Sequence, residues 1–540
     1  MRLFHTIRRT SVAVIAASIA LLPSSVFAQS EQLRLASSLE AAAAQAAGQP
    51  GGEVVRRISI DDAVKLALEQ NLGIRIQRID PQIQDMGVAQ AQALWRPNFT
   101  TGLQRNSQVQ QSTNVLSGGT TSIDNGTFST QVGVNQTLPW GGSYTGTFNN
   151  SRFTTSNLYQ SFYSPQLGSS VNLQYTQPLM RNFSMDQIRQ QVASSRKTRD
   201  LSDIQLQSVV TGTLRSVKNA YWDLVYSIDN LKAQQQSLAL SQQFLKDNQK
   251  RVEIGTLAPI DIVQAQAEVA ANEQGVIVAD AAIKQAQDAL RALVLDPGTP
   301  DFWNISFEPS DAASFAERGI DIDAAVRNAL DKRSDLHTAK NSLEQSDINM
   351  QFFNNQIKPD VNAQVSYLTT AVGGVPQAAQ TTLVDRSYGT VLGDVFKSSF
   401  PSWTVGLQIG YPLGLNTAHA NLARAKLQYE QSQAQLKNLQ MQVATQVRTA
   451  ARNVQTNQKR VGSARASREL QERKLEAEEK KLAAGMSQSF FVFQAQRDLA
   501  LARTAEIQAI ADYNKSLVDF EAVQEVPLNG FGGGITIAGR

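Results

Sequence analysis

The chain has 540 residues, a formal net charge of +3, no cysteine and three histidines. The absence of cysteine excludes disulfides, thiol catalysis and an acylated N-terminal cysteine. His337 and His419 lie far apart inside helical patterns, so neither a histidine metal site nor a Ser-His-Asp triad is indicated. No phosphate-binding glycine loop and no block of basic residues is present, so we expect no catalytic residue, no cofactor, no metal and no nucleic-acid partner.

Residues 1–28 have the pattern of a secretory signal peptide. Three arginines precede an apolar run from Val12 to Leu22, and small residues follow up to Ala28. The run has about eleven residues, whereas a membrane span needs about twenty, so an inner-membrane anchor is disfavoured. Arg8 and Arg9 leave twin-arginine export as an alternative to ordinary secretion. Removal of this segment takes the basic residues from 50 to 47, which equals the 47 acidic residues, so the exported chain is formally neutral.

The rest of the chain is a tandem duplication. A shift of 262 residues superimposes Ile60, Asp61, Ala63, Val64, Ala67, Leu68 and Pro97 on Ile322, Asp323, Ala325, Val326, Ala329, Leu330 and Pro359. Further matches follow at slipped offsets in the strand and hairpin-tip segments. Two copies of one long unit indicate internal pseudo-symmetry, which favours a closed tube over a catalytic site.

Residues 29–57 are rich in Ala, Gln and Gly and are expected to form a flexible N-terminal extension. Residues 58–97 and 322–359 then have helical composition and end at Pro97 and Pro359. Each is predicted to be one leading helix of about 35 residues.

Residues 98–178 and 360–411 contain strands with strict alternation of apolar and polar side chains. Trp403, Val405 and Leu407, for example, alternate with Thr404 and Gly406. Such alternation, with aromatic residues near the strand ends, is typical of outer-membrane barrel strands, and a soluble sandwich sheet is the alternative.

The first copy has room for an additional hairpin, because the turn-like residues 139–142 separate two strand patterns at 127–138 and 143–154. We therefore expect four strands in copy one and two in copy two. Six strands are too few to close a membrane barrel, which needs at least about eight. Three chains would share a barrel of eighteen strands, or of twelve if the additional hairpin lies outside the wall.

Residues 179–293 and 412–524 are predicted to form one long helical hairpin in each copy. The first long arm carries a coiled-coil seam with alternating spacings of four and three. Its positions are Val210, Leu214, Val217, Tyr221, Leu224, Ile228, Leu231, Gln235, Leu238, Gln242 and Leu245. The glutamines indicate a helix that packs sideways against neighbours while another face meets water.

The predicted helix lengths impose an arrangement. At 1.5 Å per residue the long arm measures about 100 Å and the return arm about 50 Å, so half of the long arm lacks a partner. The leading helix fills that half if it stacks end to end on the return helix. Residues 294–321, rich in Pro, Gly, Asp and aromatics, are then an equatorial linker, and residues 525–540 are a tail that either wraps there or has no fixed structure.

These features resemble the TolC family of outer-membrane efflux ducts over about Ile58 to Val523. The most specific are the duplicated leading helices, the Pro178-Leu179 and Pro412-Leu413 junctions and the Gln-Ala-Gln motifs that follow the tips. The resemblance implies a mainly α chain with a β-barrel portion: duplicated long α-helical hairpins form an α-barrel, continuous with a transmembrane antiparallel β-barrel and closed by homotrimerisation.

The same resemblance implies an outer-membrane protein with a large periplasmic portion, in contact with outer-membrane lipid. It implies no enzymatic activity. It also implies two partners for the protein, a periplasmic adaptor (membrane fusion protein) and an inner-membrane transporter. The adaptor contacts fall on the hairpin tips, which are Ile254, Gly255, Thr256, Leu257, Ala484, Gly485 and Met486. Helix reversal requires positive φ, so turn geometry alone also explains both glycines.

The resemblance places a closable aperture just past the tips. Some family members carry acidic residues there, whereas this chain has Phe491 and Gln494 in register, so a carboxylate ring is not expected. Phe490, Phe491 and Phe493 cluster, and threefold repetition of one ring gives a hydrophobic constriction. Alternatively, these rings lock one hairpin against its neighbour. Asp261 either bonds across to the adjoining hairpin or is an ordinary exposed acid.

The sequence therefore predicts the exit duct of a tripartite efflux or type I secretion system, which conducts substrates passively across the periplasm and outer membrane. The alternative is a trimeric coiled-coil structural or adhesive surface protein with a membrane anchor, whose barrel segment would occur once, at the C-terminus. An enzyme is the least favoured class, because the chain offers little catalytic material.

Overall fold

A computed structural model of the chain describes residues 54–112, 121–157, 159, 161–299, 302–377, 383–411, 414 and 416–525. The predicted signal peptide, most of the N-terminal extension, the Pro412-Leu413 junction and the tail after residue 525 lie outside the described residues. The described chain is mainly helical with an antiparallel sheet, as predicted. It divides into two units, one formed by residues up to Arg57 together with Gly298–Glu308, and the other by the remaining residues.

The first unit contains most of a two-stranded sheet. Its strands are β1 (Val54–Ile58) and β6 (Ile305–Pro309). Arg57 and Glu308 form an exposed ion pair of 3.0 Å between these strands. The sheet therefore joins the segment before the first helix to the linker between the two copies.

In the second unit, each leading segment forms two helices, so the prediction of one continuous leading helix is wrong. The helices are α3 (Ile60–Gln70), α4 (Leu72–Ala93), α7 (Ile322–Lys332) and α8 (Ser334–Gln356). Each pair is separated by a single residue in an extended conformation, Asn71 or Arg333.

Asn71 explains the break in the first copy. Its side-chain oxygen accepts a hydrogen bond of 3.0 Å from the amide of Ile74, which caps the start of α4. Its side-chain nitrogen donates to the carbonyl of Leu293 at 2.9 Å. Because Leu293 lies in the last turn of the return helix, the same asparagine joins the leading and return helices end to end.

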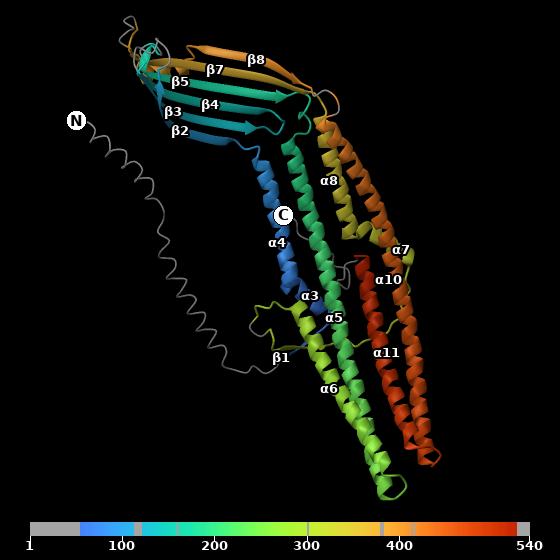
Figure 1. Ribbon diagram of the computed structural model, residues 1–540. Coiled ribbons are helices and arrows are strands. Elements are labelled where there is room, and N and C mark those ends of the chain that lie inside the picture. The colour runs from blue at the N-terminus through green and yellow to red at the C-terminus, as the bar shows by residue number, and fades with distance from the viewer. Residues whose placement is uncertain are drawn as a thin grey trace, which may run out of the picture. The chain divides into compact units, whose positions relative to one another are not determined.

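The long hairpins have equal dimensions in the two copies. The long arms are α5 (Gln187–Glu253) and α10 (Thr417–Ala483), of 67 residues each, and the return arms are α6 (Ile260–Val294) and α11 (Ser489–Val523), of 35 residues each. In Figure 1, α4 and α6 follow opposite halves of α5. The predicted end-to-end stacking beside each long arm is therefore confirmed.

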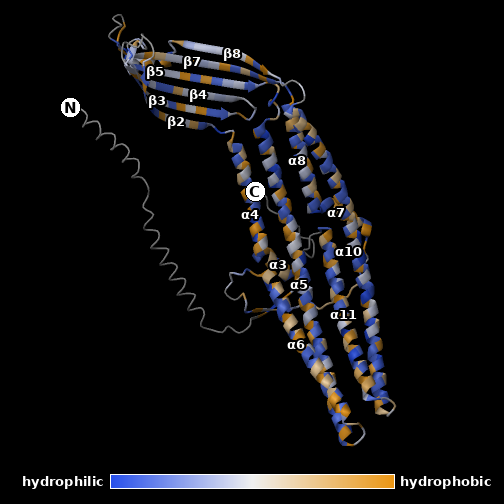
Figure 2. Cartoon of the chain, viewed as in Figure 1, coloured by the Kyte–Doolittle hydropathy of each residue, from blue (hydrophilic) through white to orange (hydrophobic). Residues whose placement is uncertain are grey.

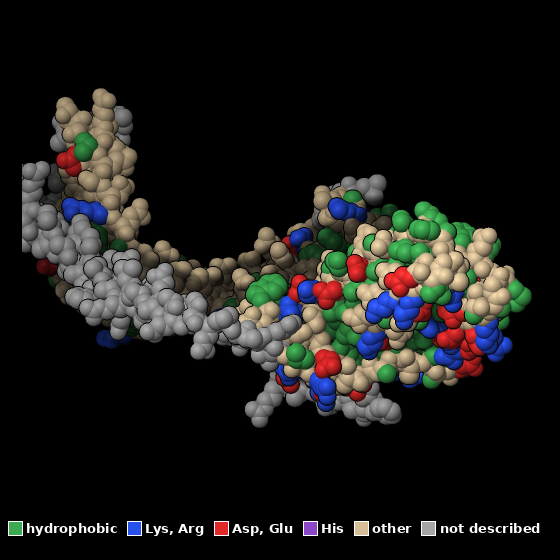
Figure 3. Space-filling view, turned by 90° about the horizontal axis from the view of Figure 1, so that it is seen from below, with side chains coloured by type: hydrophobic (Ala, Val, Ile, Leu, Met, Phe, Trp, Pro, Cys, Tyr) green, Lys and Arg blue, Asp and Glu red, His purple; other side chains and the backbone are tan. Residues whose placement is uncertain are grey.

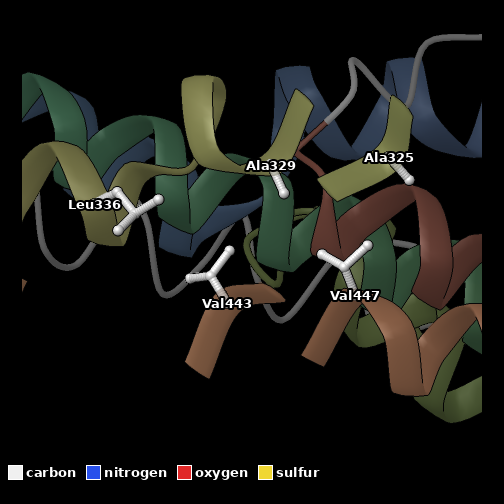
Figure 4. Packing of buried hydrophobic residues seen from close by; sticks show 5 residues of the cluster. All are labelled: Ala325, Ala329, Leu336, Val443 and Val447. Atoms are coloured by element: carbon white, nitrogen blue, oxygen red, sulfur yellow. The ribbon is translucent and has the colours of Figure 1, made fainter. Parts of the chain in front are cut away.

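The second copy is held by a core of small and branched side chains at the α7–α8 break. Figure 4 shows the side chains of Ala325, Ala329 and Leu336 opposite Val443 and Val447 of α10. Alanine at two of these positions lets the short helix approach α10 closely, and the valines fill the remaining space.

The predicted seam of α5 is buried only in part. Leu214, Val217, Tyr221 and Leu224 are buried, as predicted. Further toward the tip, Gln235 and Gln242 are exposed, and the buried positions are the small or polar residues Ala233, Ser241 and Asn248. The buried stripe does not follow the predicted 4-3 spacing to the tip. A strict 3.5-residue repeat moves slowly around an α-helix, and α5 changes partners along its length from α3 and α4 to α6 and α11.

The sheet of the second unit has the six predicted strands in the described ranges. In spatial order they are β2 (Asn98–Gln111), β3 (Ser122–Thr137), β4 (Ser143–Thr155), β5 (Tyr163–Pro178), β7 (Asp360–Pro376) and β8 (Pro401–Gly410). All neighbouring pairs are antiparallel. β5 of copy one pairs with β7 of copy two, so one continuous sheet contains both halves of the duplication.

The register gives the sheet one apolar face and one polar face, and the alternation is visible along the strands in Figure 2. The apolar face is defined here by Phe99, Leu103, Phe128, Val132, Phe148, Val171, Leu173, Tyr175, Val365, Tyr367, Trp403, Val405 and Leu407. The opposite face carries Gln104, Gln131, Thr147, Asn172, Ser366 and Thr404 among others.

A short helix that the sequence did not predict, α9 (Tyr388–Phe396), packs on the apolar face. Val391 and Val395 are buried there in a cluster with Ala371, Leu167 and Val171. A Cβ atom at Gly373 would lie 2.6 Å from a methyl group of Val391, so the close approach of α9 to β7 requires glycine.

No helix in the described ranges combines the length and the apolar character that crossing a membrane requires.

Candidate functional site

The tip of the first hairpin is a helix C-terminus closed by glycine. The amide of Gly255 donates to the carbonyl of Val252 at 3.0 Å, and the amide of Thr256 donates to the carbonyl of Arg251 at 2.8 Å. This pair of bonds is the Schellman motif, and Gly255 has the positive φ of 76° that the motif needs. The Thr256 hydroxyl also donates to the Arg251 carbonyl, at 2.9 Å.

The second tip repeats the same geometry. The amide of Gly485 donates to Leu482 at 3.2 Å, the amide of Met486 donates to Lys481 at 2.8 Å, and Gly485 has a φ of 74°. Glu478 accepts hydrogen bonds from Lys481 at 2.6 Å and from the Ser487 hydroxyl at 2.9 Å, and both lower the pKa of its carboxyl group. The two predicted tips are thus equivalent turns, and the hydrogen bonds of Glu478 stabilise the second one further.

The tips expose large apolar side chains. Ile254 is 73% exposed and Met486 is 74% exposed. Beside them Ile260, Val263 and Phe490 are also exposed. Figure 3, a view of the end at which the hairpins turn, shows hydrophobic side chains among charged ones there. A surface of this composition is typical of a protein-binding site.

The predicted aperture residues fall into two groups. Phe493 is buried, with its ring 4.9 Å from that of Phe244 in α5 and nearly perpendicular to it. Phe490, Phe491 and Gln494 are exposed. Phe493 therefore packs between the two hairpins, whereas the other three side chains are free to meet solvent or another chain.

Asp261 is half-buried in the first turn of α6. Its carboxylate has no hydrogen-bond or ion-pair partner among the residues that the structure describes. Of the two alternatives for Asp261, the bond to the adjoining hairpin is not made within the described part of one chain.

A different ion pair joins the hairpins. Arg497 of α11 donates to Glu268 of α6 at 2.7 Å, and this hydrogen bond raises the pKa of Arg497. Sequence reasoning missed both residues, although each follows its Gln-Ala-Gln motif closely and the two have opposite charge. At the 230-residue offset of the two tips, Glu268 corresponds to Asp498 and Arg497 corresponds to Ala267, so the duplication gave no signal for this pair.

A cavity of about 160 Å³ lies beside this pair, lined by polar and apolar side chains of both hairpins, including Glu268, Gln496, Arg497, Leu240 and Leu499. Within the described ranges no group of three or more His, Asp or Glu side chains is arranged to hold a metal ion. The site therefore offers exposed apolar surface at the tips and an ion pair between the two hairpins.

The helices of the second unit lie side by side in an order that leaves two free edges. α5 contacts α4 and α6 on one side and α8 and α11 on the other, and α10 follows α8 and α11. The α4–α6 edge exposes apolar side chains at Ile76, Ile79, Ile83, Met86, Ile277 and Val278. The α10 edge exposes Leu427, Met441 and Leu470. In the sheet, β2 and β8 are the edge strands.

Tandem helical hairpins with glycine tips, joined to an antiparallel sheet with one apolar face, define the fold of outer-membrane channel subunits. A family model described as "Outer membrane efflux protein" matches residues 143–294 and 325–523, which together exceed half of the chain. The chain belongs to this family, and the resemblance to the TolC-like channels is confirmed. No protein of curated function matches the sequence.

Solved channel structures share the fold at low sequence identity. The CmeC outer membrane channel of Campylobacter jejuni is 14% identical with a TM-score of 0.60, covering 86% of this chain and 85% of that chain. The outer membrane protein VceC of Vibrio cholerae is 16% identical with a TM-score of 0.59, over 86% and 96%. The MtrE outer membrane channel of Neisseria gonorrhoeae, solved in its open state, is 16% identical with a TM-score of 0.59, over 86% and 88%.

Proposed function

We propose that three copies of this chain form an exit duct that conducts substrates passively across the periplasm and the outer membrane. An energised inner-membrane transporter delivers the substrates, and a periplasmic adaptor seals the junction at the hairpin tips. The duct belongs to a tripartite efflux or type I secretion system. It binds no cofactor and catalyses no reaction.

The observation that carries this proposal is the pair of free edges. Each chain ends at α4, α6 and β2 on one side and at α10 and β8 on the other. Exposed isoleucines on one edge and exposed Leu427, Met441 and Leu470 on the other are complementary apolar surfaces. An edge strand exposes unpaired backbone N–H and C=O groups, which are costly in lipid, and closing the sheet into a barrel pairs them. If one edge of each copy packs on the opposite edge of the next copy, both edges of every copy are covered. Such head-to-tail contacts form a closed ring when the rotation between neighbouring copies divides a full turn evenly.

The six strands lie in one continuous sheet with a consistent apolar face, which favours a barrel of eighteen strands over one of twelve. In that barrel the apolar face meets lipid and the polar face lines the channel. The helices below it form the periplasmic α-barrel, with Phe490 and Phe491 available for an aperture that narrows by apolar contact.

Cross-linking tests the assembly, because the chain has no natural cysteine. Ile83 and Leu427 lie on opposite free edges, each ten residues from the sheet-side end of its helix. In a closed ring, Ile83→Cys and Leu427→Cys of neighbouring copies come close, and a short bismaleimide links them into a ladder that stops at three chains. The Leu427→Cys variant alone is the control. A product that remains monomeric, or a ladder that continues beyond three, contradicts the proposed ring.

The tip and aperture assignments need separate measurements. A photo-cross-linking residue at Thr256 or Met486 should capture the adaptor in intact cells, and the same residue at Arg327, which is exposed on α7 away from the tips, should not. Phe491→Asp should alter the entry of large antibiotics if this ring lines the aperture. Unchanged sensitivity in a normally assembled trimer would exclude Phe491 from the gate.

A further inference from the structure

Two arginines occupy one level of the apolar face. The register places Arg105 of β2 opposite Phe128 of β3, and Phe128 opposite Arg152 of β4. At strand spacings of about 4.8 Å the two Cα atoms are about 10 Å apart. Both side chains are exposed, and neither has an ion-pair or hydrogen-bond partner among the described residues. The nearest acid on this face of β3 is Asp124, four residues further from the helices.

The same register marks a second level on the face. Tyr144 of β4 lies opposite Tyr175 of β5, which lies opposite Val365 of β7. Arg152 is eight residues further along β4 than Tyr144, on the side away from the helices. With about 3.4 Å per residue and a strand tilt of about 40°, the two levels are separated by about 20 Å along the membrane normal.

The side chains between these levels are mostly apolar. They include Val132, Phe148, Val171, Leu173 and Leu103. A band of about 20 Å with aromatic residues at one limit is close to the apolar belt of membrane barrels, and the bacterial outer membrane is thinner than average. The tilt offsets Arg105 and Arg152 by only about 6 Å in height, so both stay near one limit of the band.

A cation on the lipid-facing side of a barrel is costly at the bilayer midplane and nearly free at the interface. Two unpaired arginines at the limit of the band therefore mark a headgroup level, where phosphates provide the partners that the chain does not. Since the helices lie on the periplasmic side under the proposed function, on which this inference rests, that level belongs to the outer leaflet. We propose that Arg105 and Arg152 form a binding site for the phosphates of the phosphorylated glycolipid of the outer leaflet.

The test uses the full-length trimer purified from outer membranes in mild detergent, delipidated and titrated with lipid A. Native mass spectrometry counts the bound lipid. Wild-type trimer should bind lipid A about tenfold more tightly than the Arg105→Ala, Arg152→Ala double variant, because each arginine–phosphate contact is charge-assisted. The Arg105→Lys, Arg152→Lys variant should retain an intermediate affinity, and Arg327→Ala, an exposed arginine on α7, should bind as the wild type does.

Dephosphorylated lipid A is the matched ligand control and should bind wild type as weakly as phosphorylated lipid A binds the double alanine variant. Inorganic phosphate at millimolar concentration should not displace lipid A, because the acyl chains of lipid A also contribute binding energy through contact with the apolar face. Equal affinity of wild type and double variant overturns the lipid site even when the trimer inserts and exports normally. Failure of the wild-type chain to fractionate with the outer membrane instead overturns the proposed function.

Discussion

Arg497 of α11 and Glu268 of α6 form the 2.7 Å ion pair that joins the two hairpins near their tips. Arg497 is 65% exposed at its side chain whereas Glu268 is 11% exposed, so solvent screens the pair only from one side. Arg497→Ala should weaken the contact between the two hairpins by about 0.2–1 kcal/mol. If this contact keeps the tips closed, the open population and the entry of a large antibiotic should rise by up to about fivefold. Susceptibility to vancomycin measures this effect.

The charge-swapped protein, Arg497→Glu with Glu268→Arg, should restore the wild-type susceptibility because the pair is recovered. Arg473→Ala, which removes an exposed arginine from α10, is the control for loss of charge alone. If Arg497→Ala, the charge-swapped protein and the control all show the same susceptibility, the pair does not hold the hairpins together.

Phe493 should matter more for stability than its exposed neighbour Phe490. Phe493 is 7% exposed and packs on Phe244, so Phe493→Ala leaves a cavity and should cost about 3–4 kcal/mol. Phe490→Ala removes an exposed ring and should cost well under 1 kcal/mol. Chemical unfolding of the purified protein gives both values. Equal losses for the two variants would mean that Phe490 is also buried in the assembly.

The tip glycines should be sensitive to any side chain. Gly255→Ala and Gly485→Ala force alanine into the left-handed region, at a cost of about 1–2 kcal/mol. The strain is local, so amide hydrogen exchange should become about tenfold faster at the altered tip while the rest of the hairpin is unchanged. Gly212→Ala, inside α5 with no atom near the added methyl group, should instead stabilise the helix.

Tyr221 ties the linker to the middle of α5. Its hydroxyl group donates to Asp311 at 2.8 Å and lies 3.2 Å from the carbonyl oxygen of Ile58, and the side chain is fully buried. Burial raises the pKa of Tyr221, with a smaller contribution from the bond to Asp311. Tyr221→Phe leaves Asp311 without this donor and should cost about 1–3 kcal/mol by thermal or chemical unfolding. Tyr226→Phe on the same helix, where no such bond exists among the described residues, should cost almost nothing.

Lys218 should make stability depend on pH in the alkaline range. Burial lowers its pKa, an effect that Glu521 and Asp61 partly offset. A lysine whose pKa is lower in the folded state destabilises the protein while both states are protonated, and the penalty disappears as pH rises toward the ordinary value of 10.5. Lys218→Met should therefore be more stable than wild type at pH 7, and the difference should shrink by pH 10. A difference that grows with pH contradicts burial as the cause.

Periodicity alone located most of the architecture, because the buried stripes of long helices and the alternation of strands are local properties of the sequence. The strand pairs flanking Pro139-Trp140 and the glycine tips at Gly255 and Gly485 were recognisable for this reason. The break at Asn71 was not, since helix composition continues across it and its decisive bond runs to Leu293 in a distant segment.

Two other features depended on contacts that local patterns do not contain. The helix α9 is short, contains two glycines and is stabilised by the sheet beneath it, so its own propensity is weak. Phe493 and Phe490 are three residues apart in one helix, yet Phe493 is buried and Phe490 is exposed. Which of two neighbouring rings is covered depends on Phe244 of the other hairpin.

The matched lengths of the arms restrict how this protein can change during evolution. The long arms have 67 residues each and the return arms 35 each. An insertion of one heptad in a single hairpin would carry its tip about 10 Å past the other. A lineage that needs a longer reach across a wider cell envelope must therefore lengthen four helices by the same amount.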